Sequence, residues 1–173
     1  MEPQETPIEQ DGEYRALKAL AAFMLQPKPP TPTDELEGIA EIARELTHAR
    51  YAALGVTDEQ DKMEGFVTSG LDEEAEKKLK APPQGHALLG NIRRDGKPVR
   101  VDNVEGHPDL FGFPPAHPEM QTLLGVPLWA NGVVRGSLYV TDRNGGEPFT
   151  DADEAVLLTL TRHVNRLIET EWH

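Results

Sequence analysis

Residues 122–154, TLLGVPLWANGVVRGSLYVTDRNGGEPFTDADE, decide the fold of this chain. Two apolar runs, 122–130 and 133–143, stand on either side of the dipeptide Asn131-Gly132. Asn and Gly both tolerate the positive φ that a two-residue type I′ turn requires. The stretch therefore predicts an antiparallel β-hairpin with its turn at this dipeptide.

The rest of the chain alternates between helical and strand patterns. Apolar residues at spacings of three and four predict amphipathic helices, and short β-prone runs bounded by turn residues predict strands. Thr33 is expected to cap the second helix, Gly96 to close the fourth, and Thr150 with the acids behind it to open the last. The predicted helices cover 13–25, 34–49, 72–81, 85–96 and 151–170, and the additional strands cover 50–57, 63–70 and 97–103.

This order of elements predicts the fold class α+β. A central antiparallel β-sheet is expected, with helices on both faces and with the N- and C-terminal helices packed on one side. Residues 1–33 form an N-terminal amphipathic helix with a Pro-rich linker, and residues 34–173 form the domain proper. The loop over 103–120 is long for a compact domain and is therefore a candidate for function.

Composition excludes several functions. The 173 residues include no Cys, which removes thiol nucleophiles, disulfide exchange and thiolate-bound metals. A net charge of −13 disfavours nucleic acid as a partner. The sequence contains no phosphate loop, nucleophile elbow or H-E-x-x-H motif, so we do not expect an enzyme. It also lacks a membrane-length apolar run and a signal peptide, so no membrane partner and a cytoplasmic location are expected.

The C-terminal half resembles the GAF domain, a small-ligand-binding and signalling module, and the likeness extends over roughly residues 34–170. GAF domains typically show a GVPL strand, a turn, a second strand of the form G-x-L, and then an F-x3-D-E start to the last helix. In this chain the last motif is Phe149, Asp153 and Glu154. The resemblance implies the GAF-like α+β fold and the binding of a small molecule.

A narrower likeness concerns GFPPAHPEMQTLLGVPL (112–128) followed by GSLYVTD (136–142). These segments resemble the first GAF domain of bacterial oxygen- and redox-sensing histidine kinases, which hold haem b through a histidine in an H-P-x-M segment. The resemblance implies that His117 is the proximal iron ligand, that Met120 belongs to the cofactor-binding segment, and that Tyr139 hydrogen-bonds a diatomic gas. A separate histidine kinase or regulator would then receive the signal.

The residues around His117 allow two interpretations. A proximal imidazole must be neutral, held rigidly and placed beside an apolar slot, and the proline that follows His117 restricts its backbone. Phe111, Phe113, Leu123 and Leu124 can supply apolar walls. The alternative is a loop histidine that hydrogen-bonds a backbone carbonyl and closes the pocket.

Tyr139 also has two interpretations. Strand alternation places it opposite Leu138 and Val140, on the same face as Ser137 and Thr141, so one face of this strand is more polar. Tyr139 is then either a ligand-contacting residue or an ordinary half-buried strand tyrosine whose hydroxyl bonds water or backbone.

Two further functions stay open. One is a non-haem module for an anion, nucleotide or other metabolite, with His117 and Arg100 as polar anchors. The other is a dimeric interaction scaffold. A homodimer is expected in either case, because the N-terminal helix carries an apolar stripe that needs a partner. The stripe consists of Tyr14, Leu17, Ala21, Met24 and Leu25.

Overall fold

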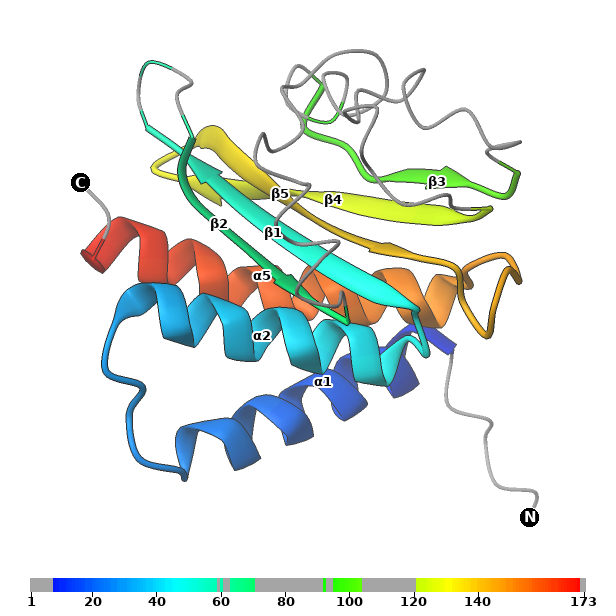
Figure 1. The fold of residues 1–173 in the computed structure, drawn as a ribbon, viewed down its shortest axis with the longest axis horizontal. Helices are drawn as coiled ribbons and strands as arrows, with labels where there is room; N and C mark the ends of the chain where they lie inside the picture. The colour runs from blue at the N-terminus through cyan, green and yellow to red at the C-terminus, as the bar shows by residue number, and fades with distance from the viewer. Residues whose placement is uncertain are drawn as a thin grey trace.

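The computed structural model describes residues 8–58, 60, 63–70, 92, 95–103 and 121–171 (Figure 1). The helices are α1 (Ile8–Met24), α2 (Pro32–Leu46) and α5 (Asp151–Glu171), and the strands are β1 (Tyr51–Thr57), β2 (Met63–Ser69), β3 (Val99–Val101), β4 (Leu123–Ala130) and β5 (Val133–Thr141). The predicted helix over 72–81 and most of the one over 85–96 lie outside the described residues.

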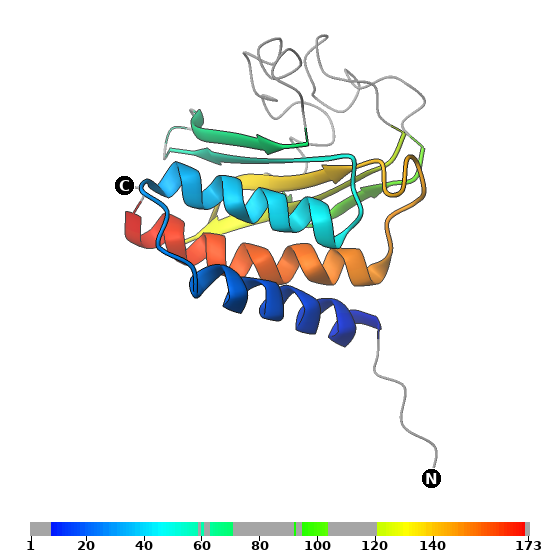
Figure 2. The ribbon, with the colours of Figure 1, turned by 60° about the horizontal axis from the view of Figure 1, so that its bottom comes forward.

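The strands form one antiparallel sheet in the order β2-β1-β5-β4-β3. Helices α2 and α5 cover one face of it, and α1 lies outermost, against α5 (Figure 2). The fold class α+β is therefore confirmed. On the other face, Ile92 is helical and fully buried, so a helical residue covers that side as well.

The hairpin of β4 and β5 forms as predicted. Asn131 has a φ of 52° and Gly132 a φ of 80°, the positive values of a type I′ turn. β5 pairs with β4 on one side and with β1 on the other, which makes it the central strand of the sheet. The turn of the hairpin therefore follows from the local sequence, whereas the β-bulge between Leu128 and Trp129 was not predicted.

The two faces of the sheet differ in what they bury. The face covered by helices, here called the helix face, includes Leu54, Leu138 and Val140, and it packs on the apolar side of α5. The opposite face, here called the tyrosine face, carries Tyr51, Ala53, Leu123 and Tyr139 with Ile92 over them. The predicted alternation of Tyr139 against Leu138 and Val140 is confirmed.

The helix caps agree with the sequence in one case and correct it in another. At α5, Thr150 Oγ1 accepts a hydrogen bond from Asp153 N at 3.2 Å, and Asp153 Oδ2 accepts one from Thr150 N at 2.9 Å, which is a reciprocal capping box. At α2 the cap is Thr31, not Thr33, because Pro32 suits the first helical turn, where its missing N–H is not needed.

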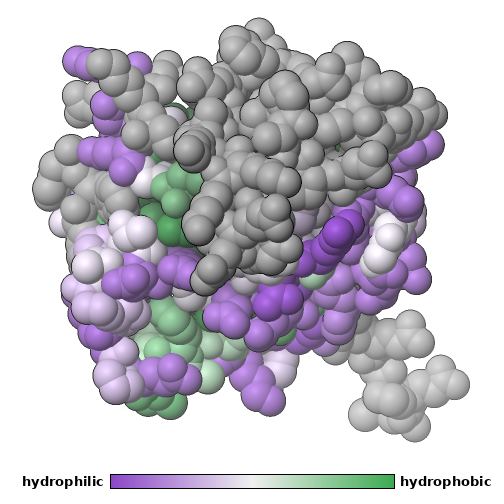
Figure 3. Space-filling model, viewed as in Figure 1, coloured by the Kyte–Doolittle hydropathy of each residue, from purple (hydrophilic) through white to green (hydrophobic). Residues whose placement is uncertain are grey.

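Helix α1 packs on the domain with a different side from the one expected. Ala16 and Leu20 are buried against the core, whereas Tyr14 is 65% exposed and Leu17 is 50% exposed. The stripe predicted from the sequence therefore faces solvent. Figure 3 shows hydrophobic surface at the lower left, over the end of α1.

Asp142 fixes the point where the long loop enters the sheet. Its Oδ1 accepts hydrogen bonds from the backbone N–H groups of Gln121, at 2.6 Å, and Thr122, at 3.1 Å. Asp142 itself has a φ of 56° and is 3% exposed. One buried side chain thus ties the end of β5 to the residues that follow the 103–120 loop.

We expect Asp142→Ala to lower the free energy of unfolding by about 2–3 kcal/mol, because two N–H groups lose a charged acceptor and alanine is strained at positive φ. Asp142→Asn is the matched control. It keeps an acceptor oxygen and tolerates positive φ, so its loss should stay near about 1 kcal/mol or less. Urea unfolding would measure both, and equal losses would contradict this role for the side chain.

Candidate functional site

The tyrosine face is built around Tyr139 by neighbours with little side chain. Ala53 of β1 and Gly125 of β4 lie directly across from Tyr139 on its two sides. One step along, Ser137 lies across from Gly55. Small residues on both sides of an aromatic ring leave room above the sheet that large side chains would otherwise fill.

Tyr139 is buried and packs on a second tyrosine. Its side chain is 3% exposed, and its ring lies edge-on to Tyr51, with centroids 6.3 Å apart and planes at 80°. Burial raises the pKa of the Tyr139 phenol far above its usual value, because the charged phenolate would lose its solvation. Tyr139 is therefore a neutral hydroxyl that can donate a hydrogen bond at any physiological pH.

Thr141 adds a second hydroxyl to the same face. It lies between Tyr51 of β1 and Leu123 of β4 in the strand register and is fully buried. Its Oγ1 has no hydrogen-bond partner within the part of the chain that the structure describes. A buried hydroxyl without a partner destabilises the fold by about 1–3 kcal/mol, so it calls for an explanation.

Ile92 covers part of this face. Its side chain is fully buried, and a Cβ placed at position 125 would lie 2.8 Å from Ile92 Cδ1. A larger residue at position 125 would therefore require the end of the Ile92 side chain to shift. Any ligand on the tyrosine face must lie beside Ile92 rather than beneath it.

The structure separates the predicted site residues into three groups. Leu123 and Tyr139 lie together on the tyrosine face, as expected. Leu124 belongs to the helix face, so its predicted role as a pocket wall is wrong. Successive residues of a strand point to opposite faces, and Leu123 and Leu124 therefore cannot line one pocket together. The other predicted site residues, Phe111, Phe113, His117 and Met120, lie outside the described residues.

Arg100 does not belong to the tyrosine face either. It pairs across the sheet with Leu124, and its Nη2 lies 3.0 Å from Asp151 Oδ1 and 3.4 Å from Glu154 Oε1, both on α5. The role of Arg100 as a pocket anchor is therefore wrong. Its partners hold β3 to the first turn of α5.

Sequence reasoning missed Tyr51 and Ile92. Tyr51 begins a strand that is buried on both faces, and such a strand shows no apolar-polar alternation from which to assign a face. One indirect signal was available for its face. Tyr51, Ala53 and Gly55 are alternate residues along the strand, so Tyr51 lies on the same face as these two small residues. For Ile92 the sequence offers no signal, because its contact with Gly125 joins distant segments.

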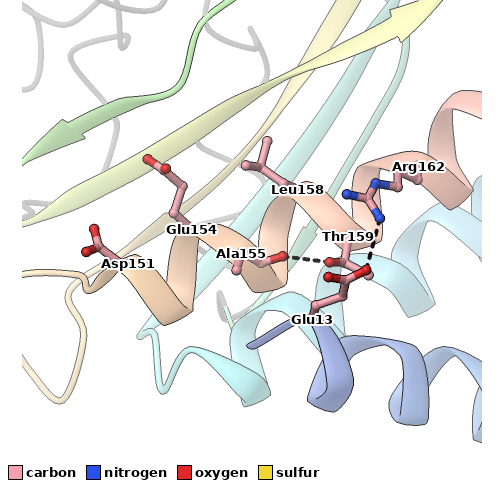
Figure 4. A pocket seen from close by; sticks show the side chains of 7 residues that line it. All are labelled: Glu13, Asp151, Glu154, Ala155, Leu158, Thr159 and Arg162. Atoms are coloured by element: carbon pink, nitrogen blue, oxygen red, sulfur yellow. Dashed lines mark hydrogen bonds and ion pairs between the residues drawn. The ribbon is translucent and has the colours of Figure 1, made fainter. Parts of the chain in front are cut away.

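A separate pocket of about 310 Å³ lies between α1 and α5, away from the tyrosine face (Figure 4). Glu13 of α1 lies 3.3 Å from Arg162 of α5 across it, and Thr159 Oγ1 donates to Ala155 O. Asp151 and Glu154 stand in the first turn of α5, where carboxylates offset the helix dipole. These contacts account for the charged residues of this pocket. Its lining consists of Glu13, Asp151, Glu154, Ala155, Leu158, Thr159 and Arg162.

The model of the GAF domain family matches residues 30–169, most of the chain. The chain belongs to the GAF domain family. This family consists of small-molecule-binding sensory and regulatory modules that are generally not catalytic. The match begins just before α2, so α1 precedes the matched region but packs on it.

Solved GAF structures have the same fold at low identity. The GAF domain of a phosphoenolpyruvate-protein phosphotransferase from Coxiella burnetii is 21% identical, with 90% of this chain and 94% of that chain covered and a TM-score of 0.71. The equivalent domain from Acinetobacter is 19% identical, with 95% of this chain and 94% of that chain covered and a TM-score of 0.67. Free methionine-R-sulfoxide reductase from Neisseria meningitidis, solved with its substrate, is 15% identical, with 96% and 93% covered and a TM-score of 0.68. These likenesses establish the fold.

Among the described residues, no group of three or more His, Cys, Asp or Glu residues is arranged to hold a metal ion. No helix within those same ranges is long and apolar enough to cross a membrane.

We expect Thr141→Val to raise the free energy of unfolding by about 1 kcal/mol in ligand-free protein, because valine keeps the shape and removes an unpartnered buried hydroxyl. The matched control is Thr161→Val on α5, where the hydroxyl donates to Leu158 O at 2.8 Å. That change should lower stability. Thermal or urea unfolding of both variants gives the comparison, and a loss in Thr141→Val would mean that its hydroxyl is satisfied.

Proposed function

We propose that this chain is a sensory GAF module that binds a small ligand on the tyrosine face. One observation carries the proposal: on the central strand β5, the buried Thr141 hydroxyl has no partner among the described residues, and it lies beside Tyr139 on the face that α1, α2 and α5 leave free. Residues 138–141 of this strand are buried on both faces, and the helices α2 and α5 cover only the helix face.

The ligand is sensed, in this proposal, through the end of β5. Asp142 follows Thr141 directly and holds Gln121 and Thr122. Arg143 comes next, and its Nε lies 3.0 Å from Asp153 Oδ2 in the first turn of α5. Asp142 and Arg143 are the two residues after Thr141, so a ligand that shifts Thr141 would also shift the end of the long loop and the start of α5. Because α1 packs on α5, a change in the population of these positions would reach both terminal helices.

Haem b is the specific ligand that we propose first. His117 would hold the iron, and Tyr139, a neutral phenol with small neighbours, would donate a hydrogen bond to a bound diatomic gas. The described residues fit an apolar planar group because Ala53 and Gly125, beside Tyr139, have little or no side chain above the sheet. Ile92 limits the space over Gly125. Haem would supply gas or redox chemistry. A separate histidine kinase or regulator in the cytoplasm would receive the signal.

The test is an absorption spectrum from about 350 nm to about 700 nm of protein produced with haem precursor. We expect an intense Soret band in the native protein and its loss in His117→Ala. His107→Ala, which alters the other His-Pro dipeptide of the same segment, should keep the band. Tyr139→Phe keeps the ring, so it should keep the band and release gas about tenfold faster.

A colourless protein after reconstitution would exclude haem and leave the ligand-binding function in place. A metabolite that raises Tm in the native protein but not in a Tyr139 variant would then identify a non-haem module. If neither haem nor any metabolite binds, a dimeric scaffold is the function that remains.

We also propose a homodimer through α1. The exposed stripe on α1 is opposite its buried side, and Met24 and Leu25 extend it at 66% and 88% exposure. A second copy packed against this side of α1 would cover the apolar residues of the stripe.

We expect Leu17→Glu to convert the dimer to a monomer, since the added carboxylate would be buried in the contact. Ala22→Glu adds the same charge on an exposed part of α1 away from the stripe, so it should stay dimeric. Light scattering coupled to size exclusion distinguishes these outcomes. A native monomer at micromolar concentration, or dissociation by both variants alike, would exclude this interface.

A further inference from the structure

Two β-bulges stand on either side of Thr57, at the end of the sheet where β1 finishes (Figure 1). Between β1 and β2, Val56 pairs with Gly65 but Thr57 pairs with Met63, which leaves Glu64 of β2 as the extra residue. Between β4 and β5, Leu128 pairs with Gly136 but Trp129 pairs with Val134, which leaves Arg135 of β5 as the extra residue. Bulges turn a side chain in a new direction and are frequent next to functional sites.

The two bulged residues meet around Thr57. Arg135 Nε donates a hydrogen bond to Thr57 O at 2.8 Å. Arg135 Nη2 lies 3.8 Å from Glu64 Oε2, which is close enough for charge attraction but too long for a hydrogen bond. Glu64, Thr57 and Arg135 therefore form one cluster across three neighbouring strands.

Two donors in this cluster are buried without an acceptor. Arg135 Nη2 has no hydrogen-bond partner within the described part of the chain, although its side chain is only 12% exposed. Thr57 Oγ1 also has none, and Thr57 is 3% exposed. Buried donors are almost always satisfied in folded proteins, so a pair of unsatisfied donors on one strand pair points to a missing acceptor.

The cluster continues the tyrosine face. Thr57 has the same strand parity as Tyr51 and Ala53, so its side chain belongs to that face. Thr57 lies four positions along β1 from Ala53, the partner of Tyr139, which is about 13 Å along the strand. Gly55 and Ser137 lie between them on β1 and β5, and Phe66 of β2, which packs on the tyrosine face, lies across from Gly55.

We propose that Arg135 Nη2 and Thr57 Oγ1 form a carboxylate subsite, which binds the charged end of a ligand whose apolar part lies over Gly55 and Ser137 toward Tyr139. This inference rests on the proposed ligand-binding function of the tyrosine face and names the ligand class. The charges favour a monoanion. A single guanidinium supplies one positive charge, and the Glu64 carboxylate beside it repels any anion but repels a doubly charged phosphate about twice as strongly as a carboxylate.

The bound carboxylate would complete the hydrogen bonding of the cluster. One of its oxygens accepts from Arg135 Nη2 and from the Thr57 hydroxyl, both of which remain donors throughout. Arg135 Nε keeps its bond to Thr57 O, which holds the guanidinium plane fixed. The subsite therefore needs no rearrangement of the main chain, and neutral analogues of the ligand should bind poorly because they leave Nη2 without a charged acceptor.

Two sources could offer such a carboxylate: a free aliphatic monocarboxylate or a propionate of a porphyrin. Nuclear magnetic resonance can follow the Nε–H signal of Arg135 and the ring signals of Tyr139 separately. One arm titrates hexanoate against hexanamide, and the other titrates zinc protoporphyrin IX against its dimethyl ester. In the arm that carries the true source, the acid should shift the Arg135 signal and the neutral analogue should not.

Three variants test the assignment. Arg135→Gln and Thr57→Val should each weaken binding of the active acid by about tenfold or more, and Thr57→Val keeps the shape of the side chain, so the protein stays folded. Arg162→Gln removes an exposed arginine of α5 and should leave binding unchanged.

The two readouts separate this inference from the proposed function. If a porphyrin or metabolite shifts the Tyr139 ring while the Arg135 signal stays still, the carboxylate subsite is wrong and the function stands. If the Arg135 signal responds to an acid and Tyr139 does not, the subsite stands and the ligand site at Tyr139 is wrong. No response of Arg135 to either acid overturns the subsite.

Discussion

The structure depends on the burial of β5 on both faces. Leu138 and Val140 pack against the helices, while Tyr139 and Thr141 face the other way, and neighbouring strands on both sides supply the main-chain hydrogen bonds. A central strand can use its full set of main-chain groups only if both neighbours are in register. The hairpin at Asn131-Gly132 fixes one register locally. The second, with β1, joins segments far apart in the sequence and fixes the position of Tyr51 against Tyr139.

The residues proposed for binding and for signalling meet at the end of this same strand. Tyr139 and Thr141 face the proposed ligand, Asp142 anchors the residues after the long loop, and Arg143 contacts the first turn of α5 through Asp153. These roles fall on consecutive residues because strand alternation ends at Asp142, whose positive φ turns the chain toward α5. The opposite end of the face carries the bulged cluster around Thr57. The tyrosine face thus has an aromatic end with hydroxyl groups and a charged end, with Gly55, Ser137 and the Phe66 ring between them.

Local patterns in the sequence account for much of the fold. The type I′ turn, the capping box at Thr150, the alternation of Tyr139 and the closure of a helix at Gly96, whose N–H donates to Ile92 O, were all predictable, since each needs only a few consecutive residues. The cap of α2 is Thr31 and not Thr33 because Pro32 occupies the first helical position, where proline is favoured. For the site, hydrophobicity alone favours both Leu123 and Leu124 as pocket walls, but strand parity puts them on opposite faces and excludes Leu124.

Within the described residues, the sequence by itself determined most of the elements, the turn of the hairpin, the resemblance to GAF domains and the face on which Tyr139 lies, because these follow from periodicities and turn chemistry within short windows. Only the tertiary structure decided which side of α1 meets the domain, that Arg100 contacts α5, and that Glu64 and Arg135 meet around Thr57. Each of these depends on the register of distant segments. A shift of one residue reverses the faces of a strand, and no local pattern records which register long-range packing selects.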